Sequence, residues 1–333
     1  MLGFAQNFNP LLLDVIFIAL LIIIALLGFL KGIKKVSINM FIFLVSFLLS
    51  FSSLTNSVKG VIATKFLNLA EFLPAGSSNI HIFVVMLFTT FLSSLIFFVL
   101  LYVVLHVVKL LLGAILKSKL KDGNDNGKSL VGRFAAAVLS LLYQGSFVVV
   151  LLLIMNTNII GMNPVIEKSN VSKGVVEVTE KLDAKLNGDI VDEIIIRVFS
   201  GDVFSSVDDD LIVSYRNIEN EAKILNDKNE YIDILNSQAL SDKEVRDFSK
   251  QRIINLRSLA VIYTRMDAFG VAKDSFMDLN EEWLTTMNRV FKNRELEKVE
   301  FTLNEYSEIR LTFVKIGLNA NLISLYEEIA VGK

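Results

Sequence analysis

The chain has 333 residues, of which 53% are hydrophobic and 20% charged, and it contains no Cys. The lack of Cys excludes disulfides, thiolate nucleophiles and Cys-ligated metal sites. Up to Asn158 the sequence carries 11 Lys and Arg against 4 Asp and Glu, and after it 22 against 31. This asymmetry predicts a basic membrane domain over residues 1–158 and an acidic soluble domain over residues 165–333.

Four long apolar segments predict four membrane-spanning helices; they cover residues 11–30, 36–54, 82–108 and 133–155. About 20 residues of helix cross the hydrocarbon core, and backbone groups left unpaired in lipid are costly. The first segment lacks a preceding basic region and is followed by its positive charges, so we expect it to be retained rather than cleaved. The fold class predicted is all-α, a four-helix integral membrane domain followed by a mainly helical soluble domain.

The charges of the connecting loops predict the orientation of these helices. Lysines follow the first apolar segment at residues 31–35, and a basic run at residues 109–133 follows the third. The longer loop between the second and third segments holds only two positive charges, Lys59 and Lys65. Because positively charged loops stay in the cytoplasm, we expect both termini, and the acidic domain, to lie outside it.

The third apolar segment continues beyond the length that a membrane requires. A helix from His81 to Leu116 would be about 54 Å long at the rise of an α-helix. Residues 109–121, in which lysines interrupt leucines, therefore either lie along the membrane surface or extend the third helix beyond it. The sequence leaves both alternatives open.

After Pro164 the apolar residues recur at three- and four-residue spacing, which is typical of amphipathic helices. Ser241 with Glu244, and Thr302 with Glu305, have the spacing of capping boxes, which open helices. These pairs predict helix starts at residues 241 and 302 of a helical bundle.

Other parts of this region are less regular. Helix breaks are expected near Gly270 and Gly317. Residues 191–199, VDEIIIRVF, fit either a short helix or a strand. The acidic run 208–210 lacks the alternating ligands and the turn glycine of a calcium loop, so we interpret it as a solvated turn.

Asp14 is the most suggestive single residue, since carboxylates inside membrane helices are costly and often functional. It also lies near the start of its helix, where a carboxylate meets free N–H groups and the positive end of the helix dipole. An ion pair with Arg133 is not expected, because the first and fourth helices run in opposite directions and would separate the two by more than about 20 Å.

Small residues predict close helix packing. Gly28 and Gly32 have the G-x-x-x-G spacing that lets helices approach within one chain or between chains. Gly132, Ala136 and Ser140 place a small residue at every fourth position of the fourth helix. We expect this face to receive the first helix.

Uncharged polar residues lie in the third and fourth helices, among them Thr90, His106, Tyr143 and Gln144. A proton-coupled pump is not expected, because no chain of ionisable groups crosses the predicted bilayer. Tyr143 and Gln144 are expected to form interhelical hydrogen bonds.

Residues 10–157 carry two short motifs in addition to the four-helix spacing. Asp14 is followed by the helix exit Gly28-Phe29-Leu30-Lys31-Gly32, and Gly132 with Arg133 opens a Gly- and Ala-rich segment that reaches Gly145. In these features the chain resembles the colicin V production protein family (CvpA), small four-helix inner-membrane proteins of bacteria. It departs at Lys31, where the family often has Arg, and at Gln144, where a basic residue is common.

The resemblance implies a bacterial cytoplasmic-membrane protein linked to colicin V (toxin) production or export and to envelope maintenance, without an established enzymatic activity. Our leading interpretation is a non-enzymatic scaffold or accessory factor, with no catalytic, cofactor-binding or metal-ligating residue expected. The alternative is a channel or transporter component with a path between helices. The expected partners are the lipid bilayer, a second copy or other membrane proteins through helix packing, and an unidentified protein for residues 165–333. Nucleic acid is not expected, because that region is acidic.

Overall fold

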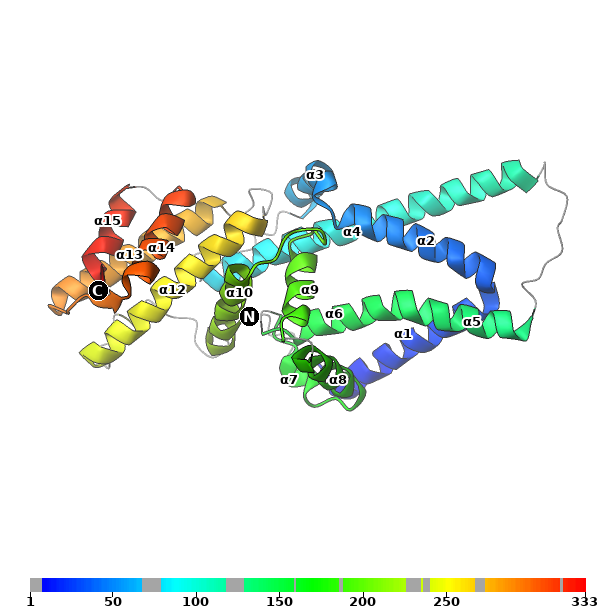
Figure 1. Ribbon diagram of the computed structural model, residues 1–333, viewed down its shortest axis with the longest axis horizontal. Coiled ribbons are helices and arrows are strands. Elements are labelled where there is room, and N and C mark those ends of the chain that lie inside the picture. The colour runs from blue at the N-terminus through cyan, green and yellow to red at the C-terminus, as the bar shows by residue number, and fades with distance from the viewer. Residues whose placement is uncertain are drawn as a thin grey trace. The chain divides into compact units, whose positions relative to one another are not determined.

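The computed structural model of the protein describes residues 8–67, 79–117, 129–158, 160–185, 188–225, 235, 240–266, 273–317 and 320–333 (Figure 1). The fold is all-α, as predicted, with four long apolar helices and further helices after them. The chain divides into two compact units. The first contains Met1–Phe66 and Thr90–Ser205, and the second contains Leu67–Thr89 and Ser206–Lys333.

The four apolar helices are α1 (Pro10–Lys31), α2 (Ile33–Ser50), α4 (Asn79–Lys117) and a composite of α5 (Leu130–Ser140), the π-helical segment η5 (Leu141–Gly145) and α6 (Ser146–Asn156). Each is long and apolar enough to cross a membrane. The predicted segments are therefore confirmed as helices. The π-helical segment was not predicted, because nothing in its composition distinguishes it from the α-helix on either side.

Two helices differ in length from the segments expected. Helix α2 ends at Ser50 instead of residue 54, because Ser52 accepts a hydrogen bond from the Leu54 N–H and starts a 3₁₀ turn at Ser53–Thr55. Helix α4 continues without interruption to Lys117. The described part of residues 109–121 thus extends the third helix, which was one of the two alternatives.

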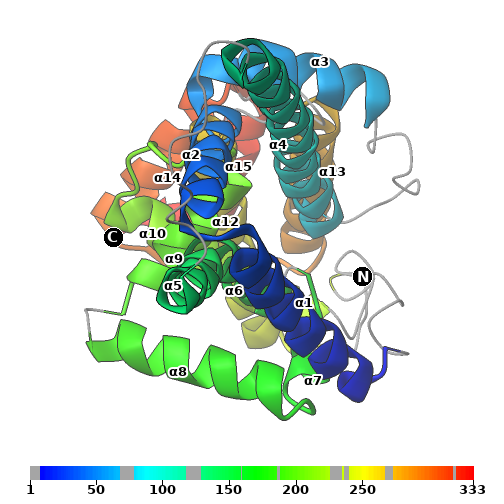
Figure 2. The same ribbon diagram turned by 90° about the vertical axis from the view of Figure 1, so that its right-hand side faces the viewer.

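Shorter helices complete the first unit: α3 (Asn56–Phe66), α7 (Asn163–Ile166), α8 (Val171–Lys185) and α9 (Ile190–Phe199). The segment VDEIIIRVF is therefore a helix. Helices α7 and α8 lie beside the first turns of α1 (Figure 2). The predicted boundary at residues 158–165 marks where the apolar sequence ends, whereas the structure groups α7, α8 and α9 with the membrane helices.

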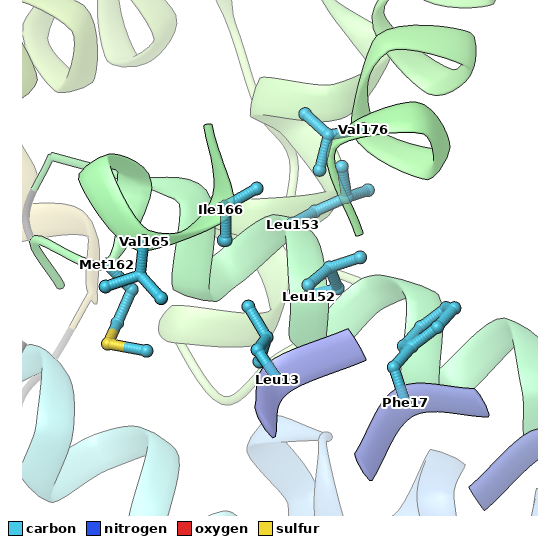
Figure 3. Close-up of a cluster of buried hydrophobic side chains, with 8 residues drawn as sticks. All are labelled: Leu13, Phe17, Leu152, Leu153, Met162, Val165, Ile166 and Val176. Atoms are coloured by element: carbon cyan, nitrogen blue, oxygen red, sulfur yellow. The ribbon is translucent and has the colours of Figure 1, made fainter. Parts of the chain in front are cut away.

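Two apolar clusters hold the first unit together. One joins α1, α6, α7 and α8 and is shown in Figure 3; its buried members are Leu13, Phe17, Leu152, Leu153, Met162, Val165, Ile166 and Val176. The other is aromatic and centres on Phe43 of α2, whose ring centroid lies 5.3 Å from that of Phe98 and 5.4 Å from that of Tyr143. These edge-to-face pairs connect α2 to α4 and to η5.

The second unit is built from α10 (Asp209–Leu225), α12 (Asp242–Met266), α13 (Lys273–Asn293), α14 (Leu303–Lys315) and α15 (Ala320–Ile329). Both predicted capping boxes are present, since Ser241 and Thr302 exchange hydrogen bonds with Glu244 and Glu305. Gly317, with φ +80°, lies in the break between α14 and α15 as expected. Gly270 lies outside the described residues.

Two features of the second unit were not predicted. Val299–Phe301 (β1) and Ala330–Gly332 (β2) form a parallel two-stranded sheet, too short for an alternating pattern to reveal. The guanidinium of Arg252 is buried in this unit and lies 4.4 Å from the centroid of the Trp283 ring, a cation–π arrangement.

Candidate functional site in the membrane-helix unit

The carboxylate of Asp14 is buried and accepts four hydrogen bonds from the start of α8. Oδ2 accepts from the Asn170 N–H at 2.8 Å and the Val171 N–H at 3.2 Å. Oδ1 accepts from the Ser172 N–H at 2.9 Å and the Ser172 hydroxyl at 2.8 Å. The first N–H groups of a helix have no intrahelical partner, so Asp14 supplies acceptors that α8 cannot provide for itself.

This arrangement favours a structural role for Asp14, as an acceptor at a helix start, over a functional carboxylate within the membrane. Each carboxylate oxygen already accepts two hydrogen bonds, and the negative charge lies at the positive end of the α8 dipole. The side chain caps a helix that lies 156 to 158 residues further along the chain, not its own helix as expected. Its role in the fold is structural, because it joins the first membrane helix to the region after the last one.

A second buried charge is Lys59 of α3, in the loop between the second and third apolar helices. Its ammonium donates to the Ser52 carbonyl at 2.9 Å and to the Gly201 carbonyl at 2.7 Å. Burial lowers the pKa of Lys59 from its usual 10.5 to about 8, and the nearby Asp202 carboxylate partly opposes this shift. Lys59 therefore fixes the segment after α9 to the end of α2.

The chain at Gly201 is closely packed as well as hydrogen-bonded. Gly201 has φ +67°, and a Cβ there would lie 2.7 Å from the Ser94 hydroxyl oxygen and 3.2 Å from Thr90 Cγ2. The Val203 N–H donates to the Phe51 carbonyl at 2.8 Å. Thr90, predicted as a polar intramembrane residue, is thus buried against the segment that follows α9.

We expect the contribution of Lys59 to stability to rise with pH above about 8. Below pH 8 the ammonium is protonated in both the folded and the unfolded chain, so the contribution is constant. Between about 8 and 10.5 the unfolded chain binds more protons than the folded one, and the free energy of unfolding rises by at most about 1.4 kcal/mol per pH unit. Denaturant titrations in detergent at pH 7.5, 8.5 and 9.5 measure this rise.

The controls for this experiment are Lys59→Met, which has no titrating group, and Lys65→Met, which removes an exposed lysine from the same helix. The difference between wild type and Lys59→Met should grow with pH, whereas the Lys65→Met difference should stay constant. A wild-type advantage over Lys59→Met that shrinks as the pH rises would contradict the assignment.

The opposite end of the first unit contains other candidate residues. The guanidinium carbon of Arg133 lies 5.9 Å from the centroid of Phe29, which is 15 residues and about 22 Å of helix rise beyond Asp14. The structure thus keeps Arg133 and Asp14 apart, as predicted. His106 contacts Tyr102, with its Nδ1 3.0 Å from the Tyr102 carbonyl oxygen.

Gly28 is a packing residue, as predicted, because a Cβ there would lie 2.6 Å from Ser140 Cβ and 2.7 Å from the Ala136 carbonyl oxygen of α5. Gly32 is buried and has a conformational role that was not predicted. It has φ +71° and forms the single-residue turn between α1 and α2, with its N–H donating to the Gly28 carbonyl. The exposed Lys31 occupies the last turn of α1.

The remaining family-motif residues lie on the α5–η5–α6 composite. Gly132 is next to Ser129, whose hydroxyl accepts the Gly132 N–H at the start of α5. Gly145 ends the π-helical segment and faces Leu21 of α1. Gln144 accepts a hydrogen bond from Ser140 at 3.4 Å, which is a contact within its own helix in place of the interhelical one expected.

An apolar groove of ≈ 410 Å³ lies between α2, the η5–α6 segment and α9. Phe43 and Phe47 line it from α2, Phe147 and Val150 from α6, and Arg197 from α9. Its volume falls in the range of about 300–1,000 Å³ typical of small-molecule sites. We refer to it below as the α2–α6–α9 groove.

In the second unit the acidic run 208–210 begins α10. Asp208 accepts the Leu211 N–H at 3.0 Å, and this hydrogen bond lowers the pKa of its carboxyl group. Asp208 also pairs with Arg265 at 2.6 Å, and Asp210 pairs with Arg257 at 2.8 Å. The run is therefore a helix start with ion pairs, instead of the free solvated turn predicted.

Three residues of the first unit matter more in the structure than sequence reasoning indicated: Lys59, Ser172 and Arg197. Lys59 had the only visible signal, as one of two lysines in a predicted loop with no other basic residue than His81. Ser172 and Arg197 look like ordinary polar residues of amphipathic helices. The partner of Ser172, Asp14, comes from a distant part of the chain. The hydrogen bonds of Arg197 to Glu193 and Val203 are local, and its place in a groove depends on α2 and α6.

Comparisons with family models, with curated proteins and with solved structures find no match to this chain.

Proposed function

We propose that this chain is a multi-pass protein of the bacterial cytoplasmic membrane that acts as a non-enzymatic scaffold or accessory factor. In line with its CvpA-like motifs, the process it serves is toxin production or export and envelope maintenance. The four apolar helices anchor the chain in the bilayer, and the helical second unit, on the outer side, contacts a partner protein. The anchor also associates with other membrane proteins or a second copy through its helices.

The observation that carries this proposal is the hydrogen bonding of Asp14. The carboxylate that looked most like a site for chemistry or transport is occupied by four donors of α8. Lys59, a buried charge of the same unit, similarly donates to two backbone carbonyls. Both charges fasten the membrane helices to the segment that follows them, which favours a stable platform over a moving carrier.

The orientation can be tested with single cysteines, since the chain has none of its own. Lys243, exposed in α12, and Lys35, exposed just after the α1–α2 turn, are replaced separately by Cys. In intact cells a membrane-impermeant maleimide should label Lys243→Cys, and it should label Lys35→Cys only after permeabilisation. The reverse pattern would overturn the orientation proposed.

The scaffold role can be tested by crosslinking in native membranes and by flux in liposomes. A photo-reactive residue at Lys243 should give a discrete adduct with another protein. Solute flux through reconstituted protein that is lost in a folded Gln144→Ala or Thr90→Ala variant would instead establish a channel or transporter.

A further inference from the structure

We propose that the α2–α6–α9 groove binds one phospholipid, with an acyl chain along α2 and α6 and the phosphate at Arg197. The inference rests only on membrane placement of the four helices and not on the scaffold role. Three observations carry it: the direction of the groove, its open apolar walls, and the guanidinium at one end.

The groove runs along the bilayer from its middle towards one surface. At one end it is lined by Leu142, 12 residues into the 27-residue span Leu130–Asn156. At the other it is lined by Val203, whose N–H donates to the Phe51 carbonyl just beyond the end of α2. A groove that covers half of a ~30 Å hydrocarbon core matches the depth of one leaflet.

The walls of the groove are apolar and open to the surroundings of the helices. Phe43, Phe47 and Phe147 form most of the aromatic surface, while Leu44 and Leu142 are exposed at its sides. In a membrane, these exposed side chains face lipid. A chain of methylenes is the molecule available in a bilayer to fill such a groove, and its close packing against the aromatic walls favours binding there.

Arg197 provides a charge complementary to a phosphate at the outer end. Its Nη2 donates to Glu193 at 3.2 Å, its Nη1 donates to the Val203 carbonyl at 3.4 Å, and its Nε has no hydrogen-bond partner among the described residues. The side chain is about one-third exposed. This guanidinium has long existing bonds on a one-third-exposed side chain and is suited to a phosphate oxygen, while its Nε is enclosed by protein atoms.

Glu193 adjusts this recognition, because it competes with phosphate for the same guanidinium. The two side chains are four residues apart on α9 and form an ion pair that is about one-third exposed, which contributes little to stability. Phosphate can therefore replace or share the carboxylate contact without disrupting the helix. Removing the carboxylate should strengthen phosphate binding.

The test uses the full chain reconstituted in liposomes with a phospholipid that carries a diazirine on its acyl chain. A diacylglycerol with the same chain serves as the probe without phosphate. After irradiation, mass spectrometry locates the labelled residues. With the phospholipid, labelling should concentrate on residues 43–47 and 147–150, and with diacylglycerol it should be at least about tenfold weaker there, as expected for the loss of a charge-assisted hydrogen bond.

Arg197→Gln should reduce phospholipid labelling of the groove at least about tenfold and leave diacylglycerol labelling unchanged, while Glu193→Gln should raise phospholipid labelling. Arg133→Gln, which removes the guanidinium at the other end of the unit, should have no effect at the groove. Circular dichroism and thermal unfolding show whether each variant folds. If Arg197→Gln does not fold, the phospholipid labelling of Glu193→Gln tests the proposal in its place.

Labelling spread evenly over the apolar helices, equal labelling by the two probes, or no change in either variant would overturn the proposal. So would a protein adduct formed in high yield by a photo-reactive residue at Leu44, since the occupant would then be another chain. A scaffold role that fails in cells leaves this result intact, because the liposome assay contains no other protein.

Discussion

Replacing Asp14 with Ala is expected to lower the free energy of unfolding of the first unit by about 3–5 kcal/mol. The substitution removes the acceptor of four hydrogen bonds. It leaves the Ser172 N–H and hydroxyl without a partner in a buried environment, and the N–H groups of Asn170 and Val171 without one in a half-buried environment. Each buried donor left unsatisfied costs about 1–3 kcal/mol. Denaturant unfolding in detergent measures the loss, and faster hydrogen exchange at residues 170–172 locates it.

Two further variants make this experiment specific. Asp14→Asn keeps one acceptor oxygen but turns an NH₂ group towards backbone donors, so it should lie between wild type and Asp14→Ala. Glu167→Ala removes an exposed carboxylate from the same region and should change stability by less than about 0.5 kcal/mol. An Asp14→Ala protein as stable as Glu167→Ala, with exchange at residues 170–172 unaltered, would contradict the capping role.

Gly28→Ala is expected to destabilise the first unit by about 1–3 kcal/mol, because the new methyl group has no room. Two of the atoms it would meet, the Ala136 carbonyl oxygen at 2.7 Å and Ala137 Cα at 3.0 Å, belong to the backbone of α5 and cannot rotate away. Helices α1 and α5 would have to separate along their contact. Thermal unfolding in detergent, together with crosslinking between α1 and α5, would report both effects.

Gly113→Ala is the matched control, since it makes the same substitution in an apolar helix where, among the described residues, no atom beyond the adjacent helix backbone lies within 4 Å of the added Cβ. It should be neutral, or stabilising by up to about 1 kcal/mol through helix propensity. Equal effects of the two substitutions would show that glycine at position 28 is not required for packing.

The helices could be predicted from sequence because local chemistry determines them. A membrane span must be apolar over about 20 residues and must pair its own backbone, so α1, α2, α4 and the α5–η5–α6 composite are visible as hydrophobic runs. The pairs Ser241 with Glu244 and Thr302 with Glu305 are equally local, since each spans one helical turn. The strand pair β1 and β2 could not be predicted in this way, because each strand is three residues long and its partner is about 30 residues away.

The candidate site was predicted only where the partner could be inferred from helix order. The small residues Gly28, Ala136 and Ser140 belong to helices that were already expected to run side by side. The contacts of Asp14 with Ser172 and of Lys59 with Gly201 join segments 158 and 142 residues apart. Sequence alone does not position α8 or the end of α9 over the membrane helices, so Asp14 seemed to be a lone carboxylate and Lys59 an ordinary loop charge.

The distance along the chain between Asp14 and Ser172 has a consequence for biosynthesis. At about 5–20 residues per second, some 8–30 s pass between the synthesis of the carboxylate and that of its last donor. During this interval the first helix can already be in the bilayer, with a charge that only water or lipid headgroups can solvate. The join between α1 and α8 therefore forms late, after all four apolar helices have been made, and translation arrested before residue 170 should leave α1 free to shift across the membrane.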